Sequence, residues 1–137
     1  MLFTLPRIWH ITILTDDVER MKRFYSDVIG FEVKEDLGNY VEFSSSGVRF
    51  ALYQRIGMLS ATGEASYGDK PGGHSFELAI PAGSPEDVER LYADYVAKGA
   101  RPVKPPKMMP WGRSTAFIAD PDGNIHELYS LKPGEEI

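Results

Sequence analysis

Two stretches of the chain carry apolar residues three or four positions apart, and each stretch ends at a glycine. The first comprises Val18, Met21, Phe24, Tyr25 and Val28 and ends at Gly30, and the second comprises Val88, Leu91, Tyr95 and Val96 and ends at Gly99. Asp16 with Glu19 three residues later is typical of a capping box, and Ser84-Pro85 followed by two acids is typical of a helix start. The pattern predicts two amphipathic helices.

Short runs rich in alternating apolar residues surround each predicted helix and predict strands. One run precedes each helix and three follow it. The runs are residues 8–14, 31–34, 40–43 and 48–54 in the first half, and 75–80, 100–103, 114–118 and 125–129 in the second. Asp120-Pro-Asp-Gly-Asn supplies a turn before the last strand. The elements therefore follow the order β-α-β-β-β twice.

Two internal sequence matches, occurring in the same order, indicate a duplicated folding unit. Residues 17–20, Asp-Val-Glu-Arg, return as residues 87–90. The glycine, leucine and tyrosine of residues 47–54 return in place in residues 123–130, which aligns Ala51 with Glu127. Chance recurrence of a common helix start would explain the first match but not both together.

We therefore predict an α+β fold made of two tandem βαβββ modules. The modules span about 6–55 and 74–131, a loop over 56–73 joins them, and together they form one domain over residues 1–137. Each module must bury one face of its sheet, so we expect two four-stranded mixed sheets that curl around a cleft, with the helices outside.

Composition excludes several classes of function. The net charge of −5, without a basic block, argues against nucleic-acid binding, since phosphate contacts require clustered Lys and Arg. The absence of cysteine excludes disulfides, thiolate metal sites and cysteine nucleophiles. No apolar run is long enough to cross a bilayer, and no signal peptide is recognisable. We expect a cytoplasmic protein without a membrane partner.

Two motifs resemble one known family when they are taken together. Trp9-His-Ile-Thr12 precedes the helix Asp17-Val-Glu-Arg-Met-Lys-Arg-Phe-Tyr25, which runs into Val28-Ile-Gly-Phe31. Near the other end, Trp111-Gly112 precedes Asp120-Pro-Asp-Gly-Asn-Ile-His-Glu127. This combination, over about residues 6–131, is similar to the glyoxalase/bleomycin-resistance/dioxygenase superfamily, also called the vicinal oxygen chelate fold.

The resemblance implies metal ligands on the first and last strands of each half. Carried over residue by residue, it places the ligands at His10 and Glu127. Glu77 stands where a histidine is usual, and Ala51 stands where the fourth ligand is expected. A site of His10, Glu77 and Glu127 suits nickel, zinc, manganese, magnesium or iron(II), or the protein holds no metal. His74 and His126 point to the opposite strand faces and do not complete the set.

Each candidate residue also has a simpler explanation. His10 could be hydrogen-bonded at a strand end, and Glu77 could pair with a lysine or arginine. Glu127 needs a cation, a donor or a wet face, because burying an unpaired carboxylate is costly. Tyr53 and Tyr129 hold equivalent places in the two halves and predict substrate contacts. Trp111, in a loop rich in Met and Pro, either covers the ligand or packs over a strand end.

Two functions follow from these observations. The first is a metal-dependent lyase or isomerase resembling lactoylglutathione lyase, in which a glutamate, Glu77 or Glu127, moves the proton of a small-molecule substrate. The second is a metal-free protein of bleomycin-resistance type that binds an antibiotic or toxin between aromatic side chains, favoured by Ala51 and the acidic charge. A pure interaction module has no distinctive feature behind it. The resemblance also implies a homodimer.

Overall fold

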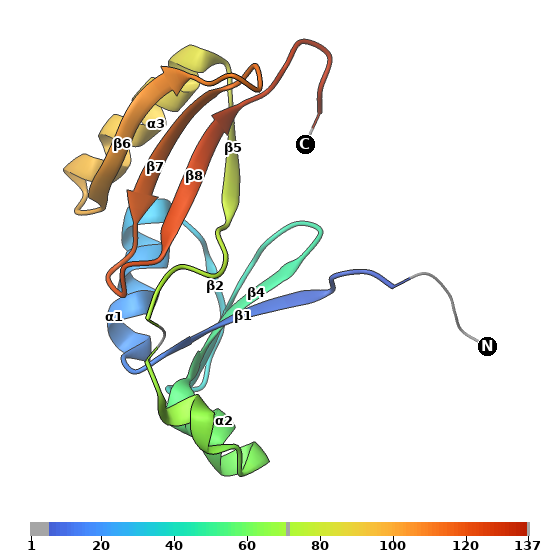
Figure 1. Ribbon diagram of the computed structural model, residues 1–137, viewed down its shortest axis with the longest axis vertical. Coiled ribbons are helices and arrows are strands. Elements are labelled where there is room, and N and C mark those ends of the chain that lie inside the picture. The colour runs from blue at the N-terminus through green and yellow to red at the C-terminus, as the bar shows by residue number, and fades with distance from the viewer. Residues whose placement is uncertain (1–5, 71, 137) are drawn as a thin grey trace. The chain divides into compact units, whose positions relative to one another are not determined.

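The computed structural model describes residues 6–70 and 72–136 (Figure 1). They divide into two compact units: the first holds residues 6–26 and 30–70, and the second holds residues 27–29 and 72–136. Each unit contains a four-stranded mixed sheet with a helix packed against it, so the predicted α+β fold of two tandem βαβββ modules is confirmed. Within the described residues, no helix is long and apolar enough to span a membrane.

The sheet of the first unit has the strand order β1-β4-β3-β2, with β1 and β4 parallel and the other pairs antiparallel. The elements in this part of the chain are β1 (His10–Thr15), α1 (Val18–Arg23), the π-helix η1 (Phe24–Ile29), β2 (Val33–Asp36), β3 (Tyr40–Phe43) and β4 (Arg49–Gln54), and residues 27–29 of η1 belong to the second unit. Four aromatic rings between helix and sheet, from Tyr25, Phe31, Phe43 and Phe50, lie with centroids 5.1–6.4 Å apart. This cluster is the core of the first unit.

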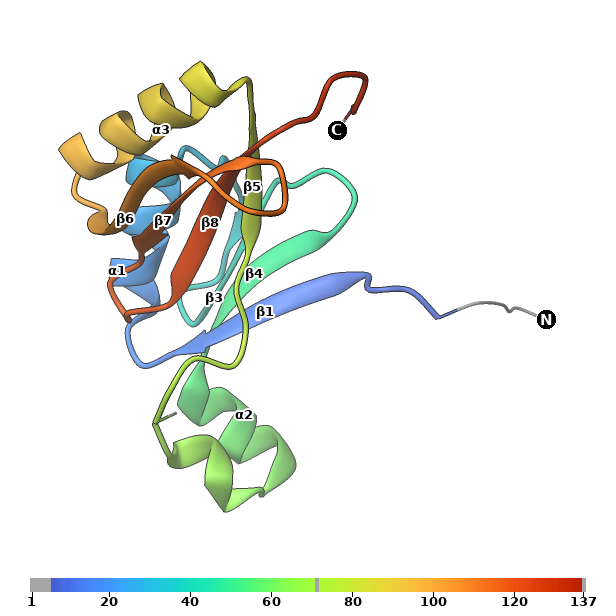
Figure 2. The same cartoon turned by 45° about the horizontal axis from the view of Figure 1, so that its top comes forward.

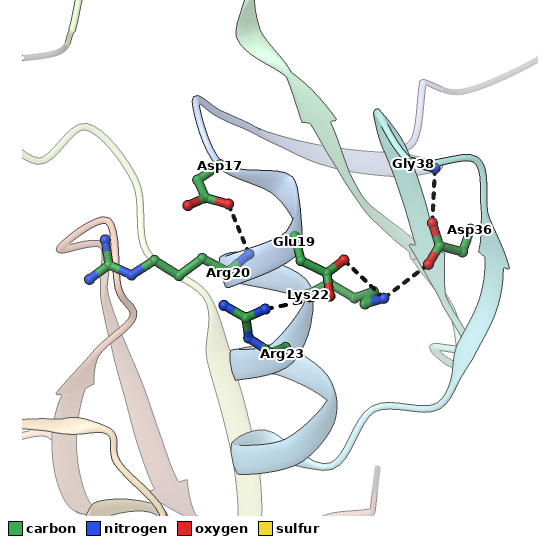
Figure 3. Close-up of polar contacts among 7 residues, drawn as sticks. All are labelled: Asp17, Glu19, Arg20, Lys22, Arg23, Asp36 and Gly38. Carbon is green, nitrogen blue, oxygen red and sulfur yellow. Dashed lines mark hydrogen bonds and ion pairs between the residues drawn. The ribbon is translucent and has the colours of Figure 1, made fainter.

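Helix α1 begins one residue later than the sequence predicted. The Asp17 carboxylate accepts the backbone N–H of Arg20, so Asp17 and not Asp16 is the N-cap (Figure 3). Glu19 consequently lies too early in the helix for a capping box, and it pairs with Lys22 instead. The Lys22 ammonium also bonds Asp36 at the end of β2, which ties α1 to the strand that follows it (Figure 3).

The sheet of the second unit repeats the arrangement of the first, with the strand order β5-β8-β7-β6. Its elements are β5 (Ala79–Gly83), α3 (Pro85–Ala97), β6 (Arg101–Met108), β7 (Ser114–Ala119) and β8 (Ile125–Ser130). Helix α3 lies along one face of this sheet (Figures 1 and 2), where Val88 and Tyr95 are buried with Leu128. Ser84 and Asp87 form the capping box at its start.

Two strands of the second unit differ in extent from the sequence prediction. β5 begins at Ala79 and not at Ser75, and just before it the backbone N–H of Leu78 donates to the side-chain Nδ1 of His126 and not to a backbone carbonyl oxygen of β8. β6 continues to Met108 through Pro105 and Pro106, which the prediction treated as a break. Proline is tolerated there because β6 is an edge strand, where an amide without a hydrogen does not interrupt a ladder.

The strand registers confirm the internal repeat. Thr12 of β1 lies opposite Ala51 of β4, and Ala79 of β5 lies opposite Glu127 of β8. Ala51 and Glu127 therefore occupy equivalent positions in the two sheets, as the sequence alignment predicted. Asp120 shapes the turn before β8, since its carboxylate accepts the backbone N–H groups of Asp122 and Asn124.

Residues 55–62 and 65–68 are helical, where the sequence predicted a loop over 56–73. They form α2 (Arg55–Thr62) and the 3-10 helix η2 (Ala65–Gly68). The prediction failed because none of the side chains of α2 is fully buried, so its apolar periodicity is weak. The Arg55 guanidinium fixes the start of α2 by donating to the Leu14 carbonyl oxygen and by pairing with Asp16.

Candidate functional site

The sheet of the first unit has two unlike faces, because successive side chains of a strand point to opposite sides. Phe43, Phe50 and Ile13 are buried on the face that carries the aromatic core. The other face, which we call the open face, consists of three rows of cross-strand neighbours. These rows are His10 with Arg49; Thr12 with Ala51 and Glu42; and Leu14 with Tyr53 and Tyr40.

A pocket of about 600 Å³ lies at the last of these rows. Its lining is apolar, aromatic or neutral polar, and consists of Thr12, Leu14, Leu37, Asn39, Tyr40, Tyr53, Met58 and Tyr67. The rings of Tyr40 and Tyr53 meet edge to face with centroids 6.1 Å apart. Met58 and Tyr67 come from α2 and η2, so the segment predicted as a loop supplies one wall.

Tyr53, a predicted ligand contact, lines this pocket, and its ring position depends on Gly57. A Cβ on Gly57 would lie 2.6 Å from the Cζ and hydroxyl oxygen of Tyr53. No real contact is that short, so any larger residue at 57 would push the ring away from α2. The absence of a side chain at Gly57 therefore lets the tyrosine pack directly against the helix.

Ala51, at the predicted ligand position of the first module, is completely buried and offers no donor atom. Beside it on β3, Glu42 is 2% exposed and carries the only carboxylate of the middle row. Its oxygens accept hydrogen bonds from the Nε of Arg49 at 2.9 Å, from the Nη2 at 2.5 Å and from the Tyr40 hydroxyl at 3.1 Å. Arg49 is the main reason why the pKa of Glu42 falls from its usual value to about 2.

His10 is partly buried at the edge of the open face, as its alternation with Ile11 predicted. Its Nε2 lies 3.5 Å from the Thr12 hydroxyl, and its strand neighbour is Arg49. The imidazole therefore has a polar contact within its own strand. Its role as a metal ligand stays a prediction.

In the second unit, Glu127 and Tyr129 lie on the face of β8 opposite to α3, and both are partly exposed. Burial raises the pKa of the Glu127 carboxyl, the negative charge of Glu77 raises it further, and Arg113 opposes both. Glu77 itself is exposed in the segment before β5. Two carboxylates of the predicted set therefore lie near enough for their charges to interact.

Arg113, which the sequence analysis did not single out, organises the surroundings of Tyr129. Its guanidinium carbon lies 5.4 Å from the ring centroid, and it donates to the carbonyl oxygen of Ser130. Glu135 binds the same guanidinium through both carboxylate oxygens, at 2.6 and 2.5 Å. This ion pair attaches the end of the chain to the sheet.

Three candidates of the sequence analysis remain, Trp111, His126 and His74. Trp111 is 52% exposed in the turn between β6 and β7, and its role in ligand binding stays a prediction. His126 is buried on the helix side of β8 with its Nε2 3.7 Å from the Asp120 carboxylate, so it faces away from Glu127 as expected. His74 is exposed before β5.

The donor atoms fit a metal ion only in part. Within each unit, the described residues hold no group of three or more His, Asp or Glu side chains arranged for a metal. In the first unit, Ala51 has no donor and Glu42 is already bound to Arg49. In the second, Glu77 and Glu127 are the oxygen ligands that a hard divalent cation prefers.

The sequence analysis did not identify three charged or aromatic residues of the open face, although they share one sequence pattern. Tyr40, Glu42 and Arg49 are large or charged side chains at every second position of otherwise apolar strands. That alternation marks a strand face that is not part of the core. Their mutual pairing depends on the register of β3 against β4, which the sequence does not reveal.

Comparison with known proteins agrees with the fold. Residues 7–128 match the family model described as the Glyoxalase/Bleomycin resistance protein/Dioxygenase superfamily. A glyoxalase/bleomycin resistance protein/dioxygenase from Nocardioides superposes with a TM-score of 0.84 at 23% identity, covering 98% of this chain and 89% of that one. Lactoylglutathione lyase from Agrobacterium tumefaciens superposes with a TM-score of 0.71 at 24% identity, covering 97% and 100%.

A curated relative is similar along nearly its whole length. The uncharacterised protein YraH of Bacillus subtilis is 27% identical over 129 residues, which cover 91% of this chain and 98% of the relative. The two structures superposed above are each less than 25% identical to this chain, so their similarity shows the fold alone. The family model covers most of the chain, including both modules. The chain therefore belongs to the glyoxalase/bleomycin resistance protein/dioxygenase superfamily.

Proposed function

We propose that this protein binds an apolar or aromatic small molecule in the pocket of the first unit, as a binding protein of bleomycin-resistance type. The observation that supports the proposal best is the pocket itself. It has the volume of a drug-sized ligand site, three tyrosines in its wall, and few polar groups to fix orientation. Ala51 in the adjoining row also supports a metal-free protein, because its side chain has no atom that could bind a metal.

The pocket can be tested with N-phenyl-1-naphthylamine, a neutral dye whose fluorescence rises in apolar surroundings. We expect saturable binding at one site per chain. Tyr53→Ala should weaken it at least tenfold, because each aromatic wall contributes area and ring contacts of about 1–2 kcal/mol. Tyr92→Ala, a tyrosine of α3 outside the pocket, is the matched control and should bind as the parent does. Equal binding by both variants would refute the proposed site.

A second candidate function is favoured by the carboxylates of the second unit. Glu77 and Glu127 would hold a divalent cation, with His10 as the further ligand that the family resemblance implies. The bound ion would stabilise negative charge on a substrate oxygen, and a glutamate would move the proton, as in a lyase or isomerase. The charge interaction between Glu77 and Glu127 supports this, because two neighbouring carboxylates are the oxygen ligands that a divalent cation prefers.

Elemental analysis separates the two functions. Stoichiometric metal in the purified protein, lost in His10→Ala and in Glu127→Gln, would favour the lyase or isomerase. Metal bound equally by both variants would refute the predicted ligands. Dye binding in the first unit without stoichiometric metal would favour the binding protein.

Two expectations accompany either function. The family resemblance predicts a homodimer, and composition predicts a cytoplasmic protein. Light scattering during size-exclusion chromatography measures the first directly. A mass of 15.3 kDa would contradict it, since that is the mass of one chain.

A further inference from the structure

The open face of the first unit changes from apolar to charged over three rows. Leu14, Tyr40 and Tyr53 line the pocket, and the row of His10 and Arg49 lies four residues away along the strands. Four residues of strand span about 13 Å. Thr12 and Ala51 of the middle row are small and neutral, and the carboxylate of its third member, Glu42, is bound to Arg49. A ligand longer than the pocket would therefore extend toward Arg49.

Arg49 is fixed in one orientation and still has donors to offer. Glu42 takes its Nε–H and one Nη2–H, which are two of the five N–H groups of a guanidinium. The side chain is nevertheless 44% exposed. Within the part of the chain that the structure describes, the remaining three N–H groups have no partner. Two of them, on Nη1 and Nη2, form the outer fork that binds a second carboxylate with two parallel hydrogen bonds.

The Glu42–Arg49 pair is a costly way to fill a sheet face. Desolvating a buried carboxylate offsets much of the attraction within the pair, and apolar residues of similar volume often stabilise a protein as well or better. The Tyr40 hydroxyl joins the pair to the wall of the pocket. A carboxylate that orients an arginine beside a ligand pocket is the arrangement expected of a binding group.

The surrounding charges define what this group recognises. Lys34 lies 3.8 Å from Glu42, and the negative charge of Glu35 acts on Arg49. With Arg49 and Glu42 themselves, the four charges cancel. Long-range attraction is therefore small, and recognition must come from directed hydrogen bonds of the guanidinium. Planar oxyanions with two oxygens satisfy that geometry.

We propose that the ligand of this pocket is an apolar or aromatic carboxylate, with its body among the tyrosines and its carboxylate on the outer fork of Arg49. The inference rests on the proposed function, since it names the class of ligand for the same pocket. Glu42 is the positioning residue, because it acts on the ligand through Arg49.

The test compares 4-phenylbutanoate with 4-phenylbutanamide, two probes of the same length and body that differ in charge. Affinities are measured by calorimetry and by displacement of N-phenyl-1-naphthylamine. The acid should bind about tenfold more tightly than the amide, the difference that one charge-assisted pair contributes.

Glu42→Gln/Arg49→Met removes both charges without leaving one buried alone, and it should make the affinities for the acid and the amide equal. Asp94→Asn/Lys98→Met, which removes an exposed pair on α3, is the matched control and should keep the preference. Tyr53→Ala should weaken both probes alike.

The outcomes separate this inference from the proposed function. Dye binding that both probes displace equally in the parent protein would overturn the carboxylate anchor and leave the pocket in place. A parent protein that binds neither dye nor probe would overturn both. If Glu42→Gln/Arg49→Met still bound the acid more tightly than the amide, the carboxylate of the probe would bind a cationic side chain other than Arg49, and the inference would be wrong.

Discussion

Replacing Arg49 with methionine should destabilise the fold in a pH-dependent way. Glu42 is 2% exposed, and the folded-state pKa of its carboxyl is about 2, against 4.5 for the ordinary group. A difference of about 2.5 units corresponds to about 3 kcal/mol of folding free energy at pH 7. Because the Arg49 side chain is 44% exposed, solvent screening reduces this, and we expect a loss of about 1–2 kcal/mol.

The sign of the pH dependence follows from the lowered pKa. The stabilisation from the pair is fully present above pH 4.5, where Glu42 is ionised in both the folded and the unfolded chain. It decreases as the pH falls from 4.5 toward 2, because the unfolded chain takes up the proton first. The difference in the free energy of unfolding between the parent and Arg49→Met should therefore be largest at neutral pH. It should become smaller as the pH falls from 4.5 toward 2.

Urea denaturation at pH 7, 4.5 and 3.5 measures both the loss of stability in Arg49→Met and its dependence on pH. Arg23→Met is the matched control, because its partner Glu19 is equally exposed and an exposed pair contributes little. It should change the free energy of unfolding by less than about 0.5 kcal/mol at every pH. An Arg49→Met protein as stable as the parent at pH 7, or a gap that does not change with pH, would refute the assigned role of the ion pair.

Three further changes test other parts of the structure. Gly57→Ala should weaken binding of N-phenyl-1-naphthylamine by displacing the Tyr53 ring, whereas Gly68→Ala, with its nearest atom 3.9 Å away, should not; equal titrations would contradict the contact. Ser84→Ala should lower the unfolding free energy by about 1 kcal/mol in urea, and no loss would argue against the capping box. Glu127→Gln should raise the free energy of unfolding at pH 7 and match the parent below pH 4.5, because a raised folded-state pKa means that the ionised carboxylate is unfavourable in the fold. A Glu127→Gln protein less stable than the parent at pH 7 would contradict this.

The fold was largely predictable because its signals are local and occur twice. Helical spacing ahead of Gly30 and Gly99, and the turn at Asp120, locate elements without any knowledge of tertiary contacts. The alignment of Ala51 with Glu127 rests on identities within the chain and was confirmed by strand register. Boundaries were less accurate, because the choice between Asp16 and Asp17 as the N-cap depends on one hydrogen bond.

The binding groups of the first unit were mostly not predictable, because they depend on pairing between elements. Tyr53 was recognised through the repeat, but its partner Tyr40 requires the antiparallel register of β3 and β4. Glu42 and Arg49 are seven residues apart and become diagonal neighbours only in that register. The wall from Met58 was hidden because α2 has no strong apolar face.

Fluorine NMR of protein labelled with 3-fluorotyrosine tests the central claim most directly, since the chain has seven tyrosines and three of them line the pocket. Titration with 4-phenylbutanoate should shift the resonances of Tyr40, Tyr53 and Tyr67 together and saturably, and should leave Tyr92 and Tyr95 unmoved. Shifts centred on Tyr129, or no saturable shift of the three pocket tyrosines, would contradict a ligand site in the first unit.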